Sequence, residues 1–493
     1  MILRMRKFLF IPLIAMLFSS CSTKEPISSE PNIIYILADD LGYGDISSFN
    51  PASKIISPNI DMIATGGMMF KDAHSGSSTG TGSRYGILTG RYSWRTEDLE
   101  EGDTGSRDKP LIDGDRLSVA SMLKEKGYST ACIGEWQLGL GWVMDREKGA
   151  TDFSRELTAG PGSYGFDYSY IVPNSLNVPP YVYIENHKVT SQPDRITSDT
   201  SKYGGWKEGL TGADFQHEEV LPHLTDKAVE WINGNANKEE PFFLYFAPTA
   251  PHAPILPSEE FRGVSSTNPY GDFVVMLDHM VGRITDALKE NNASENTIVI
   301  FTSDNGYAPG PGIEQLSTLG HSPGFVYRGH KSDIFEGGHR VPFIISWPDV
   351  IKPGRTGVSP VSLNDLIATM ADITGYNLPD DAAEDSYSML PLIKQENNKY
   401  ERESIIHYSV NGDIAIRKGK WKLIASAGTE VPGLHTEGET EETKLSEPRL
   451  YNLDSDPREE DNIAEDNPAM VDELKELLLE HIRKGRSTPG TKQ

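Results

Sequence analysis

The most informative stretch of this sequence is Asn32-Ile33-Ile34-Tyr35-Ile36-Leu37-Ala38-Asp39-Asp40-Leu41-Gly42. An apolar run rich in isoleucine ends in two adjacent aspartates, and a glycine follows shortly after. A short apolar run of this kind is typical of a strand that is buried on both faces of a parallel sheet. Carboxylates that follow such a strand lie at the carboxyl edge of the sheet, where α/β folds bind their ligands.

Similar apolar runs recur along the chain, and helix candidates separate them. The further expected strands are residues 129–133, 242–246, 297–302 and 342–347. The expected helices are residues 59–66, 117–126, 224–232 and 271–289. This alternation predicts an α/β fold, in which a mainly parallel central sheet is flanked by helices and forms one large domain over residues 32–394.

A smaller α+β subdomain is expected over residues 395–493. Residues 404–408, 414–417 and 421–424 have the pattern of antiparallel strands joined by short turns. Residues 429–448 are polar and acidic and are typical of an insertion. Residues 468–484 predict an amphipathic helix, because Leu474, Leu477 and Leu478 share one face.

The N-terminal residues predict export. Arg4, Arg6 and Lys7 precede an apolar run, residues 8–18, that is too short to span a bilayer. The run ends in Leu17-Phe18-Ser19-Ser20-Cys21, which resembles a bacterial lipoprotein box. We therefore expect residues 1–20 to be a signal peptide, Cys21 to carry a lipid, and residues 21–31 to be a tether. The protein would be a membrane-anchored lipoprotein of the periplasm or the outer membrane face, with plain secretory cleavage as the alternative.

The charge and cysteine content exclude some functions. Lys and Arg number 46 against 72 Asp and Glu, which gives a net charge of −26 and argues against a nucleic-acid partner. An acidic protein can still hold a local cationic pocket, so an anionic sugar remains a possible ligand. The chain has two cysteines. Once Cys21 is lipidated no internal disulfide can form, and Cys132 is expected to be a buried thiol.

A second acidic pair, Asp304-Asn305, also follows a predicted strand. With Asp39 and Asp40, it would bring three carboxylates and an amide to one edge of the sheet. Oxygen ligands in this number suit Ca²⁺, or alternatively Mg²⁺.

Several further motifs occur in order along nearly the whole chain, and with them the chain resembles the formylglycine-dependent sulfatases of the alkaline phosphatase superfamily. The motifs that carry the resemblance are Ser83-Arg84-Tyr85-Gly86-Ile87-Leu88-Thr89-Gly90-Arg91, Ala250-Pro251-His252-Ala253-Pro254, Arg328-Gly329-His330-Lys331, Glu336-Gly337-Gly338-His339-Arg340-Val341-Pro342, Trp421-Lys422-Leu423 and Leu450-Tyr451-Asn452-Leu453. The resemblance implies an exported enzyme that acts on a sulfated or otherwise anionic polysaccharide. It also implies that Arg84, His252 and Lys331 line a pocket around the metal.

Two motifs depart from the pattern of that family. Where the family has a Cys or Ser, a small residue and a Pro, this chain has Gly80, Thr81 and Gly82. A glycine has no side chain to oxidise, so no formylglycine is expected. The family's Gly-Lys-Trp-His-Leu-Gly motif is here Gly134-Glu135-Trp136-Gln137-Leu138-Gly139, so that Glu135 replaces a cation and Gln137 replaces an acid/base.

These departures leave three hypotheses. The first is an enzyme of polysaccharide breakdown repurposed for metal-assisted glycosidic bond cleavage, by hydrolysis or elimination, with Glu135 and His252 as acid and base and Arg84 and Lys331 assisting. Gln137 and Tyr181 would bind the substrate.

The second hypothesis is a sulfuric or phosphoric ester hydrolase that uses Thr79 or Thr81 as a substitute nucleophile. The third is a non-catalytic protein that binds the glycan through the same pocket.

Overall fold

The structure, a computed structural model, describes residues 30–96, 109–425 and 448–489. The predicted signal peptide, nearly all of the tether and the acidic insertion lie outside these residues.

The central sheet has ten strands in the order β15-β2-β14-β13-β1-β12-β4-β7-β8-β9. Five neighbouring strands in its middle are parallel: β13 (Thr297–Ser303), β1 (Asn32–Ala38), β12 (Phe242–Ala247), β4 (Ser129–Glu135) and β7 (Tyr168–Val172). The flanking strands are β2 (Met68–Phe70), β14 (Phe343–Ser346), β15 (Arg355–Gly357), β8 (Ile184–Glu185) and β9 (Lys188–Val189), of which β14 runs antiparallel to β13. The prediction of a mainly parallel sheet is confirmed.

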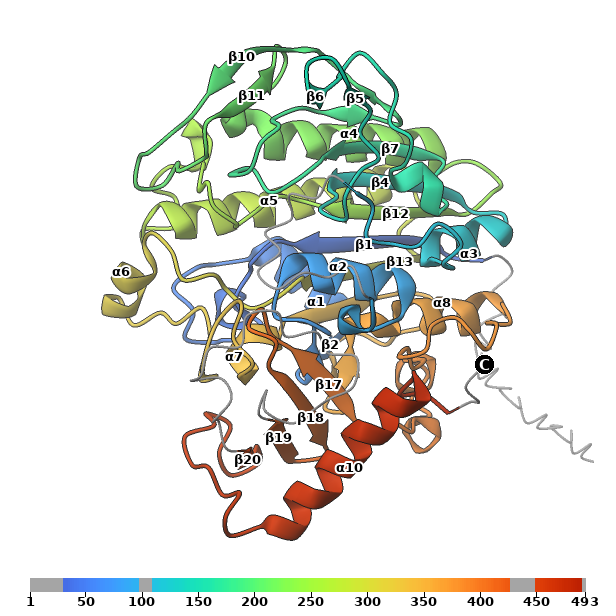
Figure 1. The fold of residues 1–493 in the computed structure, drawn as a ribbon, viewed down its shortest axis with the longest axis vertical. Helices are drawn as coiled ribbons and strands as arrows, with labels where there is room; N and C mark the ends of the chain where they lie inside the picture. Colours follow the sequence, from blue (N-terminus) through green and yellow to red (C-terminus); the bar gives the residue numbers. More distant parts are fainter. Residues whose placement is uncertain (1–29, 97–108, 426–447, 490–493) are drawn as a thin grey trace, which may run out of the picture. The chain divides into compact units, whose positions relative to one another are not determined.

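Helices cover both faces of this sheet (Figure 1). The helices are α1 (Pro58–Gly66), α2 (Gly80–Thr89), α3 (Val119–Glu125), α4 (Val220–Asn235), α5 (Pro269–Glu290), α6 (Ile313–Thr318), α7 (Glu336–His339), α8 (Leu366–Thr374), α9 (Leu390–Ile393) and α10 (Pro468–Lys484). Along β1, Ile34 and Ile36 pack with residues of α1, α4 and α5, whereas Tyr35 and Leu37 pack with residues of α2, α3 and α8. Because successive side chains point to opposite faces of a strand, β1 contributes to one hydrophobic core on each face of the sheet. Cys132 on β4 is buried as expected.

Helix α2 was not among the predicted helices. Gly80, Gly82 and Gly86 lower its intrinsic helix propensity. Every residue of this helix is nevertheless buried, so tertiary packing rather than propensity holds it in place.

The C-terminal part contains a second sheet, with four antiparallel strands in the order β17 (Ile405–Tyr408), β18 (Ile414–Lys418), β19 (Trp421–Ala425) and β20 (Arg449–Asn452). Helix α10 begins and ends at the predicted residues, and Leu474, Leu477 and Leu478 pack into a core with this sheet. This confirms a small α+β unit beside the large sheet; its first residue remains a prediction.

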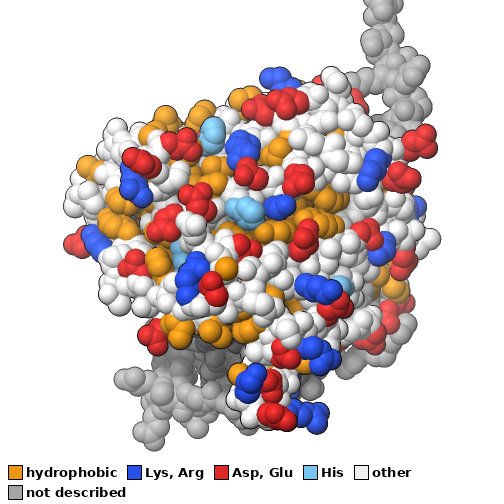
Figure 2. All heavy atoms as spheres, turned by 90° about the horizontal axis from the view of Figure 1, so that it is seen from above, with side chains coloured by type: hydrophobic (Ala, Val, Ile, Leu, Met, Phe, Trp, Pro, Cys, Tyr) orange, Lys and Arg blue, Asp and Glu red, His pale blue; other side chains and the backbone are white. Residues whose placement is uncertain are grey.

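Short strand pairs complete the architecture: β3 (Ala73–His74) with β16 (Val361–Ser362), β5 (Met144–Asp145) with β6 (Ala150–Thr151), and β10 (Pro193–Thr197) with β11 (Gly209–Gly212). On the face shown in Figure 2, acidic and basic side chains are interspersed. Within the residues that the structure describes, no helix combines the length and the apolar character needed to cross a membrane.

Candidate metal and substrate site

Four adjacent parallel strands, β13, β1, β12 and β4, deliver the predicted site residues to one edge of the sheet. Ala38 pairs with Ser303 in register, so the acidic pairs that follow are neighbours. The backbone NH of Asp40 donates to Asp304 Oδ1 at 3.1 Å. Asn305 Nδ2 donates to Asp40 Oδ1 at 2.7 Å. The structure thus brings the two acidic pairs together.

Arg84 reaches this edge from helix α2 and is fully buried. Its Nη2 atom lies 3.1 Å from Asp304 Oδ2, 3.5 Å from Asp39 Oδ2 and 3.4 Å from Glu135 Oε1. Its Nη1 atom donates to the backbone carbonyl of Glu135 at 2.9 Å. One guanidinium therefore holds three carboxylates that come from three strands.

Lys331 and His252 lie on the other side of Asp40. Lys331 Nζ is 2.7 Å from Asp40 Oδ1, and His252 Nε2 is 3.6 Å from Asp40 Oδ2. Burial on its own would raise the pKa of Asp40, but Lys331 and His252 outweigh it and lower that pKa. The side chains of Lys331 and His252 remain partly exposed, at 21% and 13%, so both line the open side of the site.

At Asp39 and Asp304 the nearby cations, Arg84 among them, lower the pKa by less than burial and the neighbouring carboxylates raise it. Burial, and next the charge of Glu135, raise the pKa of Asp39 to about 7. Burial, and next the charge of Asp39, raise the pKa of Asp304 to about 7. The protein alone therefore holds these carboxylates in an unfavourable, mutually repelling arrangement.

The free oxygen atoms of the site fit a divalent cation. Five buried side-chain oxygens accept no hydrogen bond from the described residues: Asp39 Oδ2, Asp40 Oδ2, Glu135 Oε2, Gln137 Oε1 and Asn305 Oδ1. Buried polar atoms are rarely left without a partner, and all five are acceptors, which a cation would satisfy. Four carboxylates against Arg84 and Lys331 leave two negative charges, which a divalent ion neutralises. Such an oxygen-rich set suits Ca²⁺ or Mg²⁺.

Two residues of the site have a left-handed backbone. The φ angle is 62° at Asp40 and 57° at Gln137. Side-chain-bearing residues rarely adopt this region, and such backbone strain concentrates at functional sites. Gln137 is held by its backbone NH, which donates to Pro173 O at 3.1 Å, and by its side chain, which donates to Ser175 Oγ at 3.0 Å.

Gly80 lies at the first residue of α2 and faces the acidic centre. A Cβ atom there would lie 2.7 Å from Asp304 Oδ2 and 2.7 Å from Gln137 Oε1. Both contacts are shorter than any ordinary van der Waals contact. A side chain at this position, where the resembling enzymes carry their nucleophile, would therefore meet Gln137 on one side and Asp304 on the other.

The candidate substitute nucleophiles, Thr79 and Thr81, have no contact with the carboxylates of the site among the hydrogen bonds of the described residues. Thr79 precedes α2, and its Oγ1 atom lies 3.1 Å from Ser77 Oγ. Thr81 is only 2% exposed. Among the hydrogen bonds of the described residues, neither threonine hydroxyl bonds to a carboxylate of the site. The structure gives neither of them an activating base.

Tyr181 does not have the expected position. Its side chain is 1% exposed, and its hydroxyl donates to Lys207 O at 2.7 Å. It packs against Phe215 and His217. A ring buried in this way cannot stack on a sugar, so its assignment to substrate binding is wrong.

Ser175 is a site residue that the sequence analysis missed. Its hydroxyl accepts from Gln137 Nε2 and donates to Glu135 Oε1 at 3.1 Å. It fixes Glu135 and Gln137, the two residues that depart from the family pattern in the second motif. It lies in a loop after β7, where no sequence motif distinguishes it from other loop serines.

Comparison with known proteins agrees with this geometry. A family model described as "Sulfatase" matches residues 31–376, and a model described as "N-sulphoglucosamine sulphohydrolase, C-terminal" matches residues 329–486. The chain belongs to the sulfatase family. This sulfatase-family protein carries the two acidic pairs, Arg84, His252 and Lys331 in one place, and it has a glycine at position 80.

Similar proteins extend over nearly the full length. An N-acetylgalactosamine-6-O-sulfatase of Bacteroides thetaiotaomicron is 36% identical over 488 residues, covering 92% of this chain and 93% of that protein. Human arylsulfatase A is 31% identical, covering 92% of this chain and 88% of its own. A solved structure connected with the metabolism of multiple glycosaminoglycans by Bacteroides thetaiotaomicron superposes with a TM-score of 0.80 at 34% identity, covering 92% of this chain and 100% of the other.

Proposed function

We propose that this sulfatase-family protein hydrolyses a sulfate ester on a carbohydrate, with Ca²⁺ or Mg²⁺ bound by Asp39, Asp40, Asp304 and Asn305. The observation that carries the proposal is the set of unpaired acceptor oxygens beside Arg84 and Lys331. A bound ion would offset the repulsion among the carboxylates and polarise a sulfate oxygen. Similarity to an N-acetylgalactosamine-6-O-sulfatase supports a sulfated amino sugar as the substrate class.

In this proposal a water molecule is the nucleophile, because Gly80 has no side chain and Thr79 and Thr81 have no activating base. Gln137 Oε1 is a free acceptor next to Gly80 and would orient the water. The water oxygen adds to sulfur, the bond between sulfur and the sugar oxygen breaks, and the sugar alcohol leaves. His252, at the open side, would donate the proton that the sugar oxygen takes up and would regain one of the two protons of the attacking water, so that the products are the free sugar hydroxyl and hydrogen sulfate.

Cleavage of a glycosidic bond, our first expectation, has less support than this ester hydrolysis. Glu135 is fully buried, lies against Arg84 and accepts a hydrogen bond from Ser175. Through these contacts the carboxylate of Glu135 holds Arg84 and Ser175 in place, and it does not face a sugar linkage. The named relatives are sulfatases as well.

Binding of a sulfated glycan without turnover is the second candidate. This candidate is favoured because Gln137 Oε1 lies 2.7 Å from where a Cβ atom of Gly80 would be, so no side-chain nucleophile fits there without a shift of Gln137. Glu135 also favours it, because its charge opposes an anionic substrate where the family has a cation.

The test is incubation with sulfated and uronate-containing oligosaccharides, read by mass spectrometry, with added Ca²⁺ or Mg²⁺. We expect a product that has lost the mass of one SO₃ group, and no such product with Asp304→Ala. Asp286→Ala, which changes an exposed aspartate on α5, is the matched control. Shortened chains, or a product lighter by one water, would instead indicate glycosidic cleavage. Binding without any product would support the second candidate.

We also propose that the mature protein is lipidated at Cys21 and anchored to a membrane on the exported side. The lipoprotein-like sequence that ends at Cys21 supports this. A polysaccharide substrate lies outside the cell, so an exported position fits the proposed activity.

A further inference from the structure

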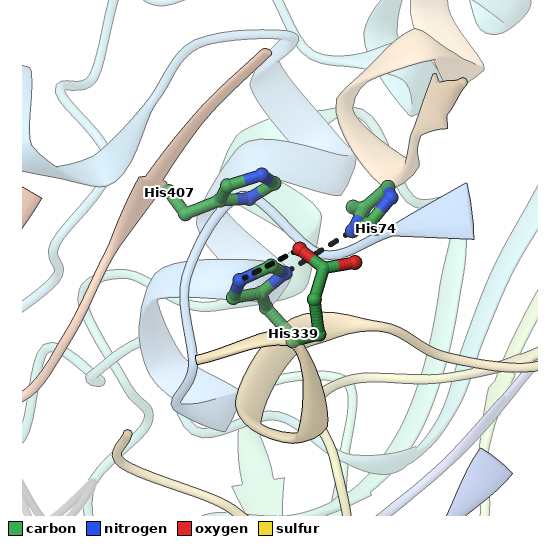
Figure 3. A group of neighbouring side chains, drawn as sticks. His74, His339 and His407 are labelled. Atoms are coloured by element: carbon green, nitrogen blue, oxygen red, sulfur yellow. Dashed lines mark hydrogen bonds and ion pairs between the residues drawn. The ribbon is translucent and has the colours of Figure 1, made fainter. Parts of the chain in front are cut away.

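A second group of metal-type ligands consists of His74, Glu336, His339 and His407, and we call it the histidine group (Figure 3). The four residues each offer one ligand atom, and these atoms all lie within 4.8 Å of one another. All four are completely buried. They come from three elements: β3 for His74, α7 for Glu336 and His339, and β17 of the C-terminal sheet for His407.

The tautomer of His74 follows from its neighbours. His74 Nε2 lies 2.8 Å from Asp72 Oδ1 and 3.1 Å from Arg417 Nη1, and that Nη1 atom donates to the carboxylate at a shorter distance. Because a carboxylate only accepts, we place the ring proton of His74 on Nε2. Arg417 donates to the same Asp72 oxygen at 2.8 Å, which keeps that carboxylate ionised. The lone pair of His74 is therefore on Nδ1. A ligating histidine bound through its other nitrogen to a carboxylate is the usual arrangement in metal sites.

His339 presents the same atom to His74. Its Nε2 lies 3.2 Å from the carbonyl oxygen of Ile334, and donation to that oxygen leaves the lone pair on Nδ1. The Nδ1 atoms of His74 and His339 are 3.1 Å apart (Figure 3). Two lone pairs at that distance repel unless a cation lies between them. Two nitrogen ligands of one tetrahedral Zn²⁺ lie about 3.3 Å apart, so the spacing suits a shared ion.

His407 is the independent observation. Both of its ring nitrogens lack a hydrogen-bond partner among the described residues, although the residue is fully buried. Its ring stacks on that of His339, with centroids 3.7 Å apart and planes 8° from parallel. Buried imidazole nitrogens are normally paired, so this one points to a ligand.

Lys422 lies at the edge of the group, with Nζ 3.2 Å from Glu336 Oε1 and 2.8 Å from Glu459 Oε1.

Lys422 also defines the alternative to a metal. Its Nζ lies 3.1 Å from His339 Nε2. If it donates there, the proton of His339 moves to Nδ1 and is donated to His74. The result is a closed chain of hydrogen bonds from Lys422 through His339 and His74 to Asp72. That chain needs no ion, but it leaves His407 without a partner.

We propose that the histidine group binds Zn²⁺, or a similar nitrogen-preferring divalent metal, through His74, His339, His407 and Glu336. Three imidazoles and one carboxylate suit zinc rather than calcium. With four protein ligands no coordination position is left for a substrate, so the ion is structural. It joins β17 of the C-terminal sheet to β3 and α7 beside the large sheet.

The test uses tag-free Asp304→Ala protein stripped with a chelator, so that the oxygen-rich site is disabled. Calorimetric titration should show one Zn²⁺ bound per chain, with a rise in the unfolding temperature. His407→Phe keeps the ring stack but removes a ligand, and it should lose this binding. His187→Phe, which changes an exposed histidine, should retain it.

No saturable Zn²⁺ binding to the stripped protein, or unchanged binding by His407→Phe, would overturn the proposal in favour of the hydrogen-bonded chain. If His407→Phe does not fold, X-ray absorption of the zinc-loaded Asp304→Ala protein decides. A spectrum at the zinc edge that shows scattering from the imidazoles of three histidines supports the site. A spectrum that shows oxygen ligands alone overturns the proposal.

Discussion

A Cβ atom placed on Gly80 would lie 2.7 Å from Gln137 Oε1. Moving the side chain of Gln137 away from this position would break the hydrogen bond that its Nε2 donates to Ser175 Oγ, and its backbone NH is held by Pro173 O. The loss of a side chain at residue 80 and the gain of a glutamine at residue 137 are therefore one coupled structural change.

This coupling predicts the stability of simple variants. Gly80→Ala should destabilise the protein by about 1–3 kcal/mol through overcrowding, and adding Gln137→Ala should recover part of that loss. Urea unfolding measures both. Gly66→Ala is the matched control, because a Cβ on this helical glycine meets nothing within 4 Å and should cost nothing. Additive effects of the two changes would contradict the coupling.

The charge at residue 135 predicts the effect of restoring the family pattern. Gly80→Cys, Glu135→Lys and Gln137→His combined, with the formylglycine-forming enzyme coexpressed, should raise sulfatase kcat/KM at least about 100-fold. Gly82→Pro, the remaining difference, is hindered because a Cβ there lies 2.6 Å from Ser77 Oγ. Equal rates for the unaltered protein and the combined variant would show that the natural site already has full activity.

Loss of the charge of one proposed metal ligand should weaken binding at the oxygen-rich site. Asp304→Asn keeps the shape of the side chain but removes a charge, and Ca²⁺ affinity should fall by more than about 10-fold to 100-fold, the loss typical of an outer contact. Calorimetric titration with Ca²⁺ measures this affinity, and Asp286→Asn is the control variant. Undiminished calcium affinity would mean that the ion binds elsewhere.

His217 predicts a pH dependence of stability. Its ring stacks on Trp206 with centroids 3.9 Å apart, and burial lowers its pKa to about 4. The unfolded chain, with an ordinary pKa of about 6.5, then binds more protons than the folded one between these values. Stability contributed by neutral His217 is complete above pH 6.5 and is lost as the pH falls towards 4.

At pH 5 this loss should reach about 2 kcal/mol relative to pH 7. His217→Phe keeps the stack without a titrating group, so the difference between its free energies of unfolding at pH 7 and pH 5 should be smaller by that amount. Identical pH profiles for the two proteins would rule out His217 as the source.

The predicted lipid anchor is tested by Cys21→Ala. The unaltered protein should partition into the detergent phase after cell lysis, and the variant should remain in the aqueous phase, because the acyl chains supply the membrane affinity. An aqueous unaltered protein would indicate plain secretory cleavage instead.

The sequence predicted the part of the site that follows from strand geometry. Asp39 and Asp304 could be predicted to lie close together because parallel strands end at the same edge of a sheet. Ser175 and His407 could not, because their positions depend on the path of a loop and on the packing of the second sheet. Tyr181 was misassigned because an aromatic residue in a proline-rich segment is equally suited to a binding surface and to a core.

Helix α2 shows a different limit. Gly80, Gly82 and Gly86 argue locally against a helix, yet complete burial of this segment overrides that preference. Local propensity is weakest as a guide where small residues are needed for close packing. In α2 this packing also places Gly80 and Arg84 beside the carboxylates of the site.

The position of β1 in the sheet has a consequence for how the chain acquires its shape. β1 is the first strand of the sheet to be synthesised, but its two neighbours, β12 and β13, begin more than two hundred residues later. Asp39 and Asp40 cannot pair with Asp304 and Asn305 until residue 305 has been synthesised, so a metal ion bound by both pairs would not guide the early steps of folding. Slow closure of such long loops would keep the chain open, as the proposed export requires.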